Sequence, residues 1–317
     1  MGHPFVKNTF APCPPELLAR ARGAGPVNML VVQAGASLPM QSAYDAYKAG
    51  IATPILIGDT SEIAEQAKTI GWDISNIETI QAIGEQDSAT SAVSCLQSRG
   101  ILSADNTDGI GAILKGQLHT DVFMGALLQR DAGVRIGNRL VHVFAIYPDN
   151  GPPLLVSDAA VNVAPDIDTR VEAALAIAEM SRRLGQPCPR IAILSATESI
   201  LTAMPSSGEA AEIALRAAAL DLQAEFAGPL SFDLAISPEA AAIKGVGGPV
   251  AGMADGLVVP DIVSGNILFK SIVWFSGGLA AGVVLGGAIP IVLTSRSDSP
   301  AARMASLAMA VIYNQKI

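Results

Sequence analysis

The sequence predicts an α/β protein of two domains with largely parallel sheets. Short runs rich in Val, Ile and Leu alternate with longer helical stretches, an order that is typical of parallel strands joined by crossover helices. Half of the residues are apolar and only 15% are charged, so much of the chain must be buried. The 317 residues suffice for two ordinary domains, and abundant Ala and Gly with few aromatics favour close packing of helices on a sheet.

The first part of the chain predicts a series of strands and helices. Residues 27–33 form an apolar run of strand length, and the helical stretch 38–50 ends at a glycine, a common helix stop. Residues 1–25, with several prolines and glycines, predict an irregular arm with a short helix. The remaining elements expected here are strand 53–57, helix 62–71, strand 78–83, helix 87–100, strand 111–114 and helix 120–128.

The second part continues the alternation after a break near 138–150. The stretch 168–184 predicts a helix with Asp168 as its N-cap and Gly185 as its stop. Segments 204–208 and 244–252 are rich in turn residues and predict surface loops that face a cleft. The other expected elements are strands 141–146, 154–157 and 191–194 and helix 209–222, and the pattern continues through 226–232, 238–243, 256–259 and 266–275.

The uncharged run 271–294 could belong either to a membrane span or to the interior of an α/β protein. From Ser271 to Thr294 no residue is charged, which is long enough to cross a bilayer. The run contains five glycines and Pro290, so we interpret it as a helix, a turn near 286–287 and a buried strand at 289–293. An α/β protein hides both elements, because parallel strands are apolar on both faces. A membrane span is the less favoured alternative.

Charge and cysteine usage limit the partners. The net charge of −9 argues against nucleic acid, whose phosphates need a basic face, while a local Arg/Lys pocket can still hold a small anion. The three cysteines, Cys13, Cys95 and Cys188, are far apart and predict free thiols in a reducing cytoplasm. Only three histidines accompany them, so we expect no zinc site, and the N-terminus shows no secretory signal.

A polar cluster follows the predicted strand 289–293. It consists of Ser295, Arg296, Ser297, Asp298 and Ser299, and Pro300 opens a helix directly after it. In open α/β sheets, ligands bind beyond the carboxyl ends of the strands. Hydroxyls and a helix N-terminus supply donors for an anion, and a guanidinium adds a planar fork that suits phosphate. The cluster therefore predicts an anion site.

Five segments resemble, in order and spacing, the motifs of the phosphate acetyl/butyryltransferase family. The likeness extends from residue 27 to the C-terminus and is strongest after 154, and the Ser-Arg-x-Asp-Ser form is closer to the butyryl-type branch. The segments are Leu114-Lys115-Gly116 with Thr120, the run 157–166, the run 228–233, the run 260–270 with Asp261, Gly265, Asn266 and Lys270, and the run 294–299.

This resemblance implies an enzyme that transfers a short acyl group reversibly between coenzyme A and inorganic phosphate. The CoA thiolate would attack the acyl phosphate directly, without an acyl-enzyme. The implied architecture is that of isocitrate/isopropylmalate dehydrogenase, with an interdomain cleft between a first domain (1–138 plus 284–317) and a second (139–283). We expect acyl-CoA and phosphate as the substrates, a homodimer in the cytoplasm, and no metal, redox cofactor, nucleic acid or membrane.

Roles for the cluster residues follow from what this transfer needs. Arg296 is expected to hold phosphate or the developing oxyanion, and Ser295 to donate a hydrogen bond to the carbonyl oxygen or phosphate. Asp298 is a candidate general base for the thiol, with helix capping beside Pro300 as the alternative. The acetyl-type branch places its base seven residues after its motif serine, where this chain has Ala302, so the role of Asp298 is our inference. The expected substrate-binding residues are Lys115, Thr120, Asn266, Lys270 and Ser297.

Gly125 departs from the family pattern, which usually has an arginine there that helps to hold phosphate. Arg130 or Arg135 could substitute, although a solvated helix face is the favoured interpretation of each. This departure favours the alternative function, a non-catalytic acyl-CoA-binding regulatory protein of the same fold. A membrane-associated acyltransferase that uses the uncharged run is a third hypothesis.

Three further polar residues are expected to be structural. Asp158 and Asn162 flank a turn after a strand, where hydrogen bonding to the backbone is typical. His142 lies in an apolar run and predicts a core histidine with satisfied hydrogen bonds.

Overall fold

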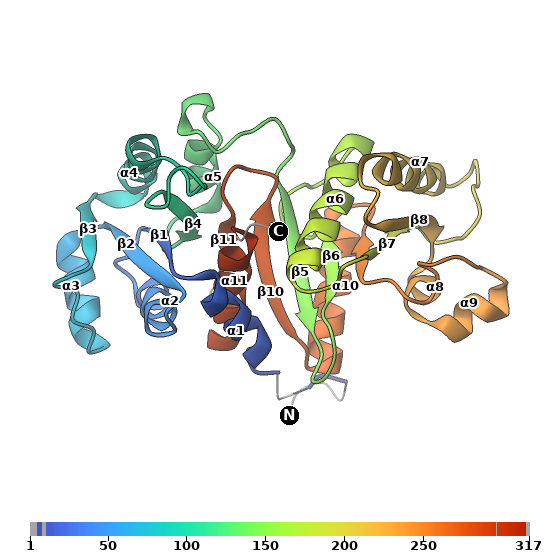
Figure 1. The fold of residues 1–317 in the computed structure, drawn as a ribbon, viewed down its shortest axis with the longest axis horizontal. Helices are drawn as coiled ribbons and strands as arrows, with labels where there is room; N and C mark the ends of the chain where they lie inside the picture. The colour runs from blue at the N-terminus through green and yellow to red at the C-terminus, as the bar shows by residue number, and fades with distance from the viewer. Residues whose placement is uncertain (1–4, 8–10, 296, 315–317) are drawn as a thin grey trace. The chain divides into compact units, whose positions relative to one another are not determined.

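The computed structural model describes residues 5–7, 11–295 and 297–314 (Figure 1). Contacts divide the chain into two compact units. The terminal unit consists of Pro12–Asn138 and Gly282–Ile317, and the central unit consists of Met1–Ala11 and Arg139–Ala281. Strand β10 (Leu279–Leu285) carries the chain from the central unit into the terminal one.

The terminal unit holds a parallel sheet with the strand order β3-β2-β1-β4-β11. Strands β1 and β4 are almost wholly buried, as expected for parallel strands that are covered on both faces. Strand β10 pairs antiparallel with β11, with Val284 opposite Ile291. The strands are β1 (Val27–Val32), β2 (Ala52–Gly58), β3 (Glu78–Gln81), β4 (Ile110–Lys115) and β11 (Ile291–Leu293).

Helices cover both faces of this sheet (Figure 1). Helix α11 packs against α1 and α2 on one face, and α4 packs against α5 on the other. The side chain of Asp59 caps α3 by accepting a hydrogen bond from Ser61 N. The helices are α1 (Pro15–Ala24), α2 (Ser37–Lys48), α3 (Thr60–Thr69), α4 (Gly84–Arg99), α5 (Thr120–Leu127), the 3₁₀ turn η1 (Arg130–Ala132) and α11 (Pro300–Tyr313).

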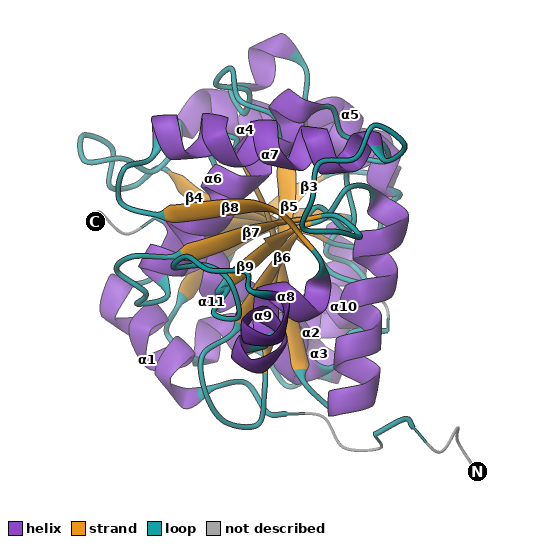
Figure 2. Cartoon of the chain, turned by 90° about the vertical axis from the view of Figure 1, so that its right-hand side faces the viewer, coloured by secondary structure: helices purple, strands orange, loops and turns teal. Residues whose placement is uncertain are grey.

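The central unit has the strand order β5-β6-β9-β7-β8, in which only the β5–β6 pair is antiparallel. Helices α6 and α7 lie over one face of these strands, and α8 and α10 over the other (Figure 2). The elements are β5 (Val141–Tyr147), β6 (Leu154–Ser157), α6 (Ile167–Arg183), β7 (Arg190–Leu194), α7 (Pro205–Leu220), β8 (Glu225–Leu230), α8 (Phe232–Ile236), α9 (Pro238–Lys244), β9 (Gly256–Val258) and α10 (Ile262–Ser276).

Two close approaches explain why these strands and helices pack as they do. A Cβ on Gly256 of β9 would lie 2.2 Å from Ile177 Cγ2, so only glycine lets α6 approach that face. On the other face, Leu257 belongs to a core cluster against which Phe269 and Ile272 of α10 pack. The expected α/β class with largely parallel strands is therefore confirmed.

The uncharged run departs from the prediction. It contains the end of α10, strand β10, a turn and β11, whereas the prediction had a helix up to the 286–287 turn and no strand at 279–285. Helix α10 ends at Ser276 and is capped by Gly277, whose φ of +78° favours glycine, and the chain turns there into β10. A short apolar run cannot be assigned to strand or helix from periodicity alone, which explains the error.

Two local predictions were also wrong. Residues 205–208, predicted as part of a loop, form the first turn of α7, because Pro205 occupies a position that a helix start tolerates. The N-cap of α6 is Asp166, whose carboxylate accepts a hydrogen bond from Thr169 N at 2.8 Å. The carboxylate of Asp168 instead pairs with Arg216 at 2.6 Å.

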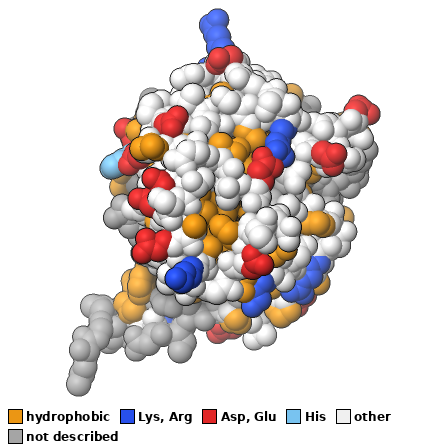
Figure 3. Space-filling model, turned by 90° about the vertical axis from the view of Figure 1, so that its left-hand side faces the viewer, with side chains coloured by type: hydrophobic (Ala, Val, Ile, Leu, Met, Phe, Trp, Pro, Cys, Tyr) orange, Lys and Arg blue, Asp and Glu red, His pale blue; other side chains and the backbone are white. Residues whose placement is uncertain are grey.

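Surface features bear on the expected partners. Within the described parts of the chain, no helix has the length and apolar character that a membrane crossing requires. On the side of α3 and β3, basic side chains lie scattered among acidic ones (Figure 3). That face therefore offers no continuous basic strip of the kind that tracks a nucleic-acid backbone.

Candidate functional site

The carboxyl ends of three strands of the terminal unit lie level with one another. Lys115, the last residue of β4, pairs with Val32 of β1 and with Leu293 of β11. The loops that follow these strands therefore begin at the same edge of the sheet, which is where open α/β sheets bind ligands. This register brings Lys115 next to the segment that starts at Thr294.

Gly116 lets the loop after β4 lie against the end of β1. Its backbone N–H donates to Val32 O at 2.8 Å, and the next N–H, of Gln117, donates to Gln33 O at 3.0 Å. A Cβ on Gly116 would lie 2.3 Å from Gln33 O and 2.4 Å from Val32 O. The Lys-Gly sequence thus has a steric reason at this position.

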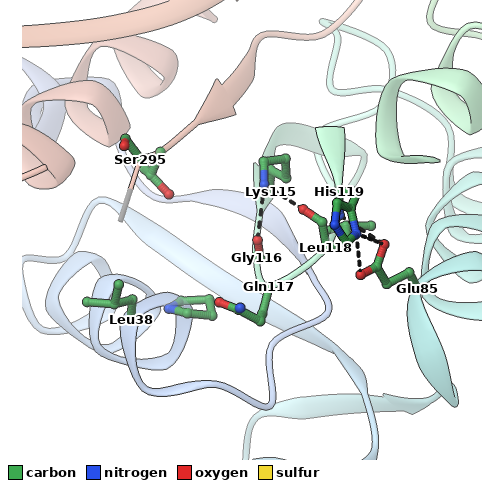
Figure 4. A pocket seen from close by; sticks show the side chains of 10 residues that line it. Leu38, Glu85, Lys115, Gly116, Gln117, Leu118, His119 and Ser295 are labelled. Carbon is green, nitrogen blue, oxygen red and sulfur yellow. Dashed lines mark hydrogen bonds and ion pairs between the residues drawn. The ribbon is translucent and has the colours of Figure 1, made fainter. Parts of the chain in front are cut away.

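A cavity of about 120 Å³ opens at this edge of the sheet (Figure 4). Two of the segments that resemble family motifs, the loop after β4 and the segment after β11, contribute to its wall. Its lining consists of Leu38, Pro39, Glu85, Lys115, Gly116, Gln117, Leu118, His119, Thr294 and Ser295.

Lys115 also holds its own loop. Its Nζ donates to Leu118 O at 2.7 Å and lies 3.4 Å from Gly116 O. The side chain is half-buried, so an ammonium charge stands in the cavity wall on a folded-back loop. A cation held in a cavity wall is a suitable feature for binding an anion.

The segment 294–299 forms a hydrogen-bonded turn. Ser295 N donates to Asp298 Oδ2 at 2.7 Å, and the hydroxyls of Ser295 and Ser297 lie 3.0 Å apart. Ser299 caps α11 by accepting from Ala302 N at 3.1 Å, so the capping role considered for Asp298 belongs to its neighbour. Arg296 lies outside the described residues.

Burial raises the pKa of Asp298, while the Ser295 N–H and the charge of Arg303 act in the opposite direction. Arg303 is 5% exposed; its Nη1 donates to Asp298 O at 2.6 Å and its Nε to Ser42 Oγ at 3.0 Å. A half-buried carboxyl with a raised pKa is better suited to accept a proton than an exposed one. Arg303, which the sequence analysis missed, fixes this turn from α11.

Other predicted residues lie outside the cavity lining. Thr120 is the exposed first residue of α5, and Ser297 is exposed in the turn. Arg130, in η1, and Arg135, in the loop after it, are both exposed, so the helix face expected for each holds only for Arg130. Gly125 lies in α5, where an added Cβ would meet nothing within 4 Å.

Asn266 and Lys270 belong to α10 of the central unit. The Asn266 side-chain amide lies 3.4 Å from Ala159 O, and the Lys270 ammonium lies 5.9 Å from the centre of the Phe269 ring. Lys270 is exposed and Asn266 is half-buried. Their assignment to the substrate site stays a prediction.

Glu85 and His119 are cavity residues that the sequence analysis missed. Glu85 accepts a hydrogen bond from His119 N at 2.9 Å, and its two carboxylate oxygens lie 2.8 and 2.9 Å from the ring Nδ1 (Figure 4). These hydrogen bonds, together with the charges of His119 and Lys115, lower the pKa of Glu85. The position of His119 beside the Lys115-Gly116 turn was the one signal that could have suggested it.

The Asp158 carboxylate has the structural role predicted for it. Its Oδ1 accepts from Ala160 N and Val161 N, both at 2.9 Å, and its Oδ2 accepts from the Asn162 side chain at 2.6 Å. Asp158 is 2% exposed, so these bonds lie in the interior and fix the turn between β6 and α6. The prediction of structural hydrogen bonding for Asp158 and Asn162 is confirmed.

His142 is buried as predicted, but its hydrogen bonds are not all satisfied. Its Nδ1 has no hydrogen-bond partner among the described residues. Burial lowers the pKa of His142 to about 4, although the Asp158 carboxylate favours the charged form. The ring is therefore held neutral against Phe144, with 4.1 Å between the ring centres.

Comparisons with known proteins first define the fold class. The chain is similar to a branched-chain phosphotransacylase from Enterococcus faecalis over 90% of this chain and 98% of that one, with a TM-score of 0.76 and 31% identity. It also shares its fold with 4-hydroxythreonine-4-phosphate dehydrogenase from Klebsiella pneumoniae, with a TM-score of 0.54 and 12% identity over 92% of this chain and all of that one. The expected dehydrogenase-like architecture is confirmed.

The family follows from the sequence matches. Residues 112–311 match the family described as phosphate acetyl/butaryl transferase. A phosphate acetyltransferase from Rhizobium meliloti is 36% identical over 94% of this chain and 92% of that protein. The chain belongs to the phosphate acetyl/butaryl transferase family.

Proposed function

We propose that this protein is a phosphate acyltransferase that converts acyl-CoA and phosphate reversibly into acyl phosphate and CoA. Membership of the family supports this function. The single observation that carries it is the register of β4 with β11, which puts Lys115 and Ser295 in the lining of one cavity. These residues come from two of the segments that resemble the family's motifs.

The proposed donors for phosphate and for the developing oxyanion come from the cavity wall and from the segment 294–299 beside it. In the proposal, the Lys115 ammonium and the hydroxyls of Ser295 and Ser297 bind phosphate oxygens, together with the guanidinium of Arg296. Donors fixed before the reaction stabilise a tetrahedral oxyanion without further reorganisation. Thr120, Asn266 and Lys270 complete the proposed set of substrate-binding residues.

Asp298 is the proposed base for the CoA thiol. The thiolate is the nucleophile, so a proton must leave sulfur before or during attack on the acyl carbon. The raised pKa of the Asp298 carboxyl supports this role. The thiolate then attacks the acyl phosphate directly, and no metal or redox cofactor takes part.

We further propose a cytoplasmic homodimer. Helix α10 supports the dimer, because Gly265 is its one buried residue and Val263, Ile267, Trp274 and Phe275 are 48–63% exposed. Exposed apolar side chains that gather on one element mark interaction surfaces. Light scattering that gives the molar mass of a single chain for the wild-type protein would reject the dimer.

The free cysteines support the proposed cytoplasmic location, because thiols stay reduced there. Cell fractionation tests this location.

The assay for the proposed function follows CoA release from acetyl-, propionyl- and butyryl-CoA. We expect release that depends on phosphate for at least one donor, and a loss on the order of 10²-fold in Arg296→Ala. No release from any donor, with CoA binding intact in calorimetry, would reject the enzyme and favour the regulatory alternative. Equal rates for the wild type and Arg296→Ala would reject the role of Arg296.

A further inference from the structure

His119 stands in the wall of the cavity with one ring nitrogen already engaged. Its Nδ1 lies 2.8 Å from Glu85 Oε1, and its backbone N–H donates to Glu85 Oε2. The side chain is 78% exposed, and no hydrogen-bond partner of its Nε2 occurs among the described residues. A carboxylate that holds one nitrogen of a histidine and leaves the other accessible is an arrangement suited to proton transfer.

The proposed reaction requires a second proton transfer besides that from the thiol. When CoA attacks an acyl phosphate, a sulfur–carbon bond forms and the carbon–oxygen bond to phosphate breaks. The departing group would be trivalent phosphate, which is strongly basic, unless a proton reaches its oxygen. Protonation of that oxygen gives HPO₄²⁻, so a donor close to the phosphate would lower the barrier.

We propose that His119, oriented by Glu85, gives the Nε2 proton to the departing phosphate oxygen and takes it back when phosphate attacks acyl-CoA. This inference rests on the proposed function and adds a catalytic residue to it. The thiol proton goes to Asp298, so each turnover leaves His119 neutral and Asp298 protonated. Exchange with solvent restores both groups, and no net proton is lost or gained by the protein.

The charges around His119 suit this role. Glu85 from α4 faces the ring directly, and Lys115 from β4 shares the cavity wall. Asp121 is the acidic residue in the first turn of α5, the helix that His119 precedes. Because Glu85 is engaged through Nδ1–H, Nε2 is the nitrogen that exchanges the proton, and the carboxylate stabilises the imidazolium. The Lys115 ammonium attracts phosphate to the same cavity.

Rescue by free imidazole tests the proposal. We expect kcat of His119→Ala to fall on the order of 10²-fold while KM for phosphate changes little. Added imidazole should restore much of the lost rate, because the side chain that it replaces is exposed. Gln86→Ala, an exposed change next to Glu85 on α4, is the matched control and should behave as the wild type.

The pH dependence gives a second readout that a purely structural role would not alter. In the direction from acyl phosphate to acyl-CoA, His119 must start protonated, and in the opposite direction it must start neutral. For the wild type, kcat/KM should therefore fall with rising pH in the direction that forms acyl-CoA. In the opposite direction it should rise with pH. Both of these pH-dependent limbs should vanish in His119→Ala. Glu85→Gln should weaken the same limbs while leaving the fold intact.

The outcomes separate this inference from the proposed function. If the wild-type protein releases no CoA, the proposed function itself has failed. If the wild type is active, and His119→Ala has the same rate and pH profile, His119 takes no part in proton transfer. A slow His119→Ala variant that imidazole leaves unchanged, with its pH limbs retained, would show a structural role and overturn the proposal.

Discussion

At the scale of single residues, the interior of the central unit keeps a neutral histidine beside an aspartate. His142 N lies 3.2 Å from Asp158 Oδ2, while the imidazole itself packs against Phe144 without a partner for Nδ1 among the described residues. The Asp158 carboxylate favours the charged imidazole, but the burial of the ring outweighs that effect. Protonation of His142 at low pH should therefore destabilise the central unit.

Stability should fall as the pH decreases from 6.5 toward 4. The folded pKa of His142, about 4, lies below its ordinary value of 6.5, so its stabilising effect is present above 6.5 and is lost as pH falls toward the folded pKa. The full loss is on the order of 3 kcal/mol, at 1.36 kcal/mol per pKa unit. Urea unfolding at several pH values measures this loss, with His142→Gln as the comparison. Parallel pH curves for the two proteins would contradict the assignment.

Residue roles could be predicted from sequence where the partners are close along the chain. Asp158 bonds backbone groups within four residues of itself, so a turn after a strand sufficed to predict its function. Glu85 and His119 are 34 residues apart and meet only through the packing of α4 and α5. Arg303 reaches Ser42 across 261 residues, a contact that no local pattern indicates.

At the scale of elements, the close approach of β1 and β4 decides the shape of the cavity. The loop after β4 starts with Gly116, which lies against the carbonyl groups of Val32 and Gln33. Lys115 immediately precedes it and lines the cavity. Any side chain at 116 must push the two strand ends apart and displace the ammonium group.

Gly116→Ala should therefore damage both stability and activity. We expect a loss of about 2 kcal/mol or more in the free energy of unfolding, because the added methyl overlaps backbone oxygen atoms that cannot rotate away. Gly125→Ala is the matched control: it lies in α5 in open space and should stabilise the protein by roughly 0.5–1 kcal/mol. Urea unfolding and CoA release measure both effects. A Gly116→Ala protein with wild-type stability and rate would refute the steric argument.

At this scale, a segment could be predicted as helix or strand where its hydrophobic periodicity and the residues that end it indicate the same element. The strands 27–33 and 191–194 correspond closely to β1 and β7, because short β-branched runs end at polar residues. In the uncharged run 271–294, no charged residue marks where one element ends and the next begins. Strand β10, which lies between the glycine pairs Gly277-Gly278 and Gly286-Gly287, was therefore missed. Sheet order cannot be predicted in this way, since β11 joins β4 from the far end of the chain.

At the scale of the whole molecule, the site of the terminal unit combines segments from both ends of the sequence. Lys115 lies in the first part of the chain, and Ser295 arrives only after the central unit has been completed. The family motifs predicted that these segments act together, whereas composition and periodicity predicted only that both follow strands. The acyl group cannot be predicted at this scale, because relatives include an acetyltransferase and a branched-chain phosphotransacylase.

The most direct test of acyl transfer in this cavity is the amount of acyl phosphate that forms for each CoA released. Acyl phosphate is trapped as the hydroxamate in the wild type and in Lys115→Met, which keeps a side chain of similar length without its charge. We predict one acyl phosphate per CoA in the wild type and a loss on the order of 10²-fold in rate for Lys115→Met. CoA release without acyl phosphate, or an unchanged rate in Lys115→Met, would contradict the account.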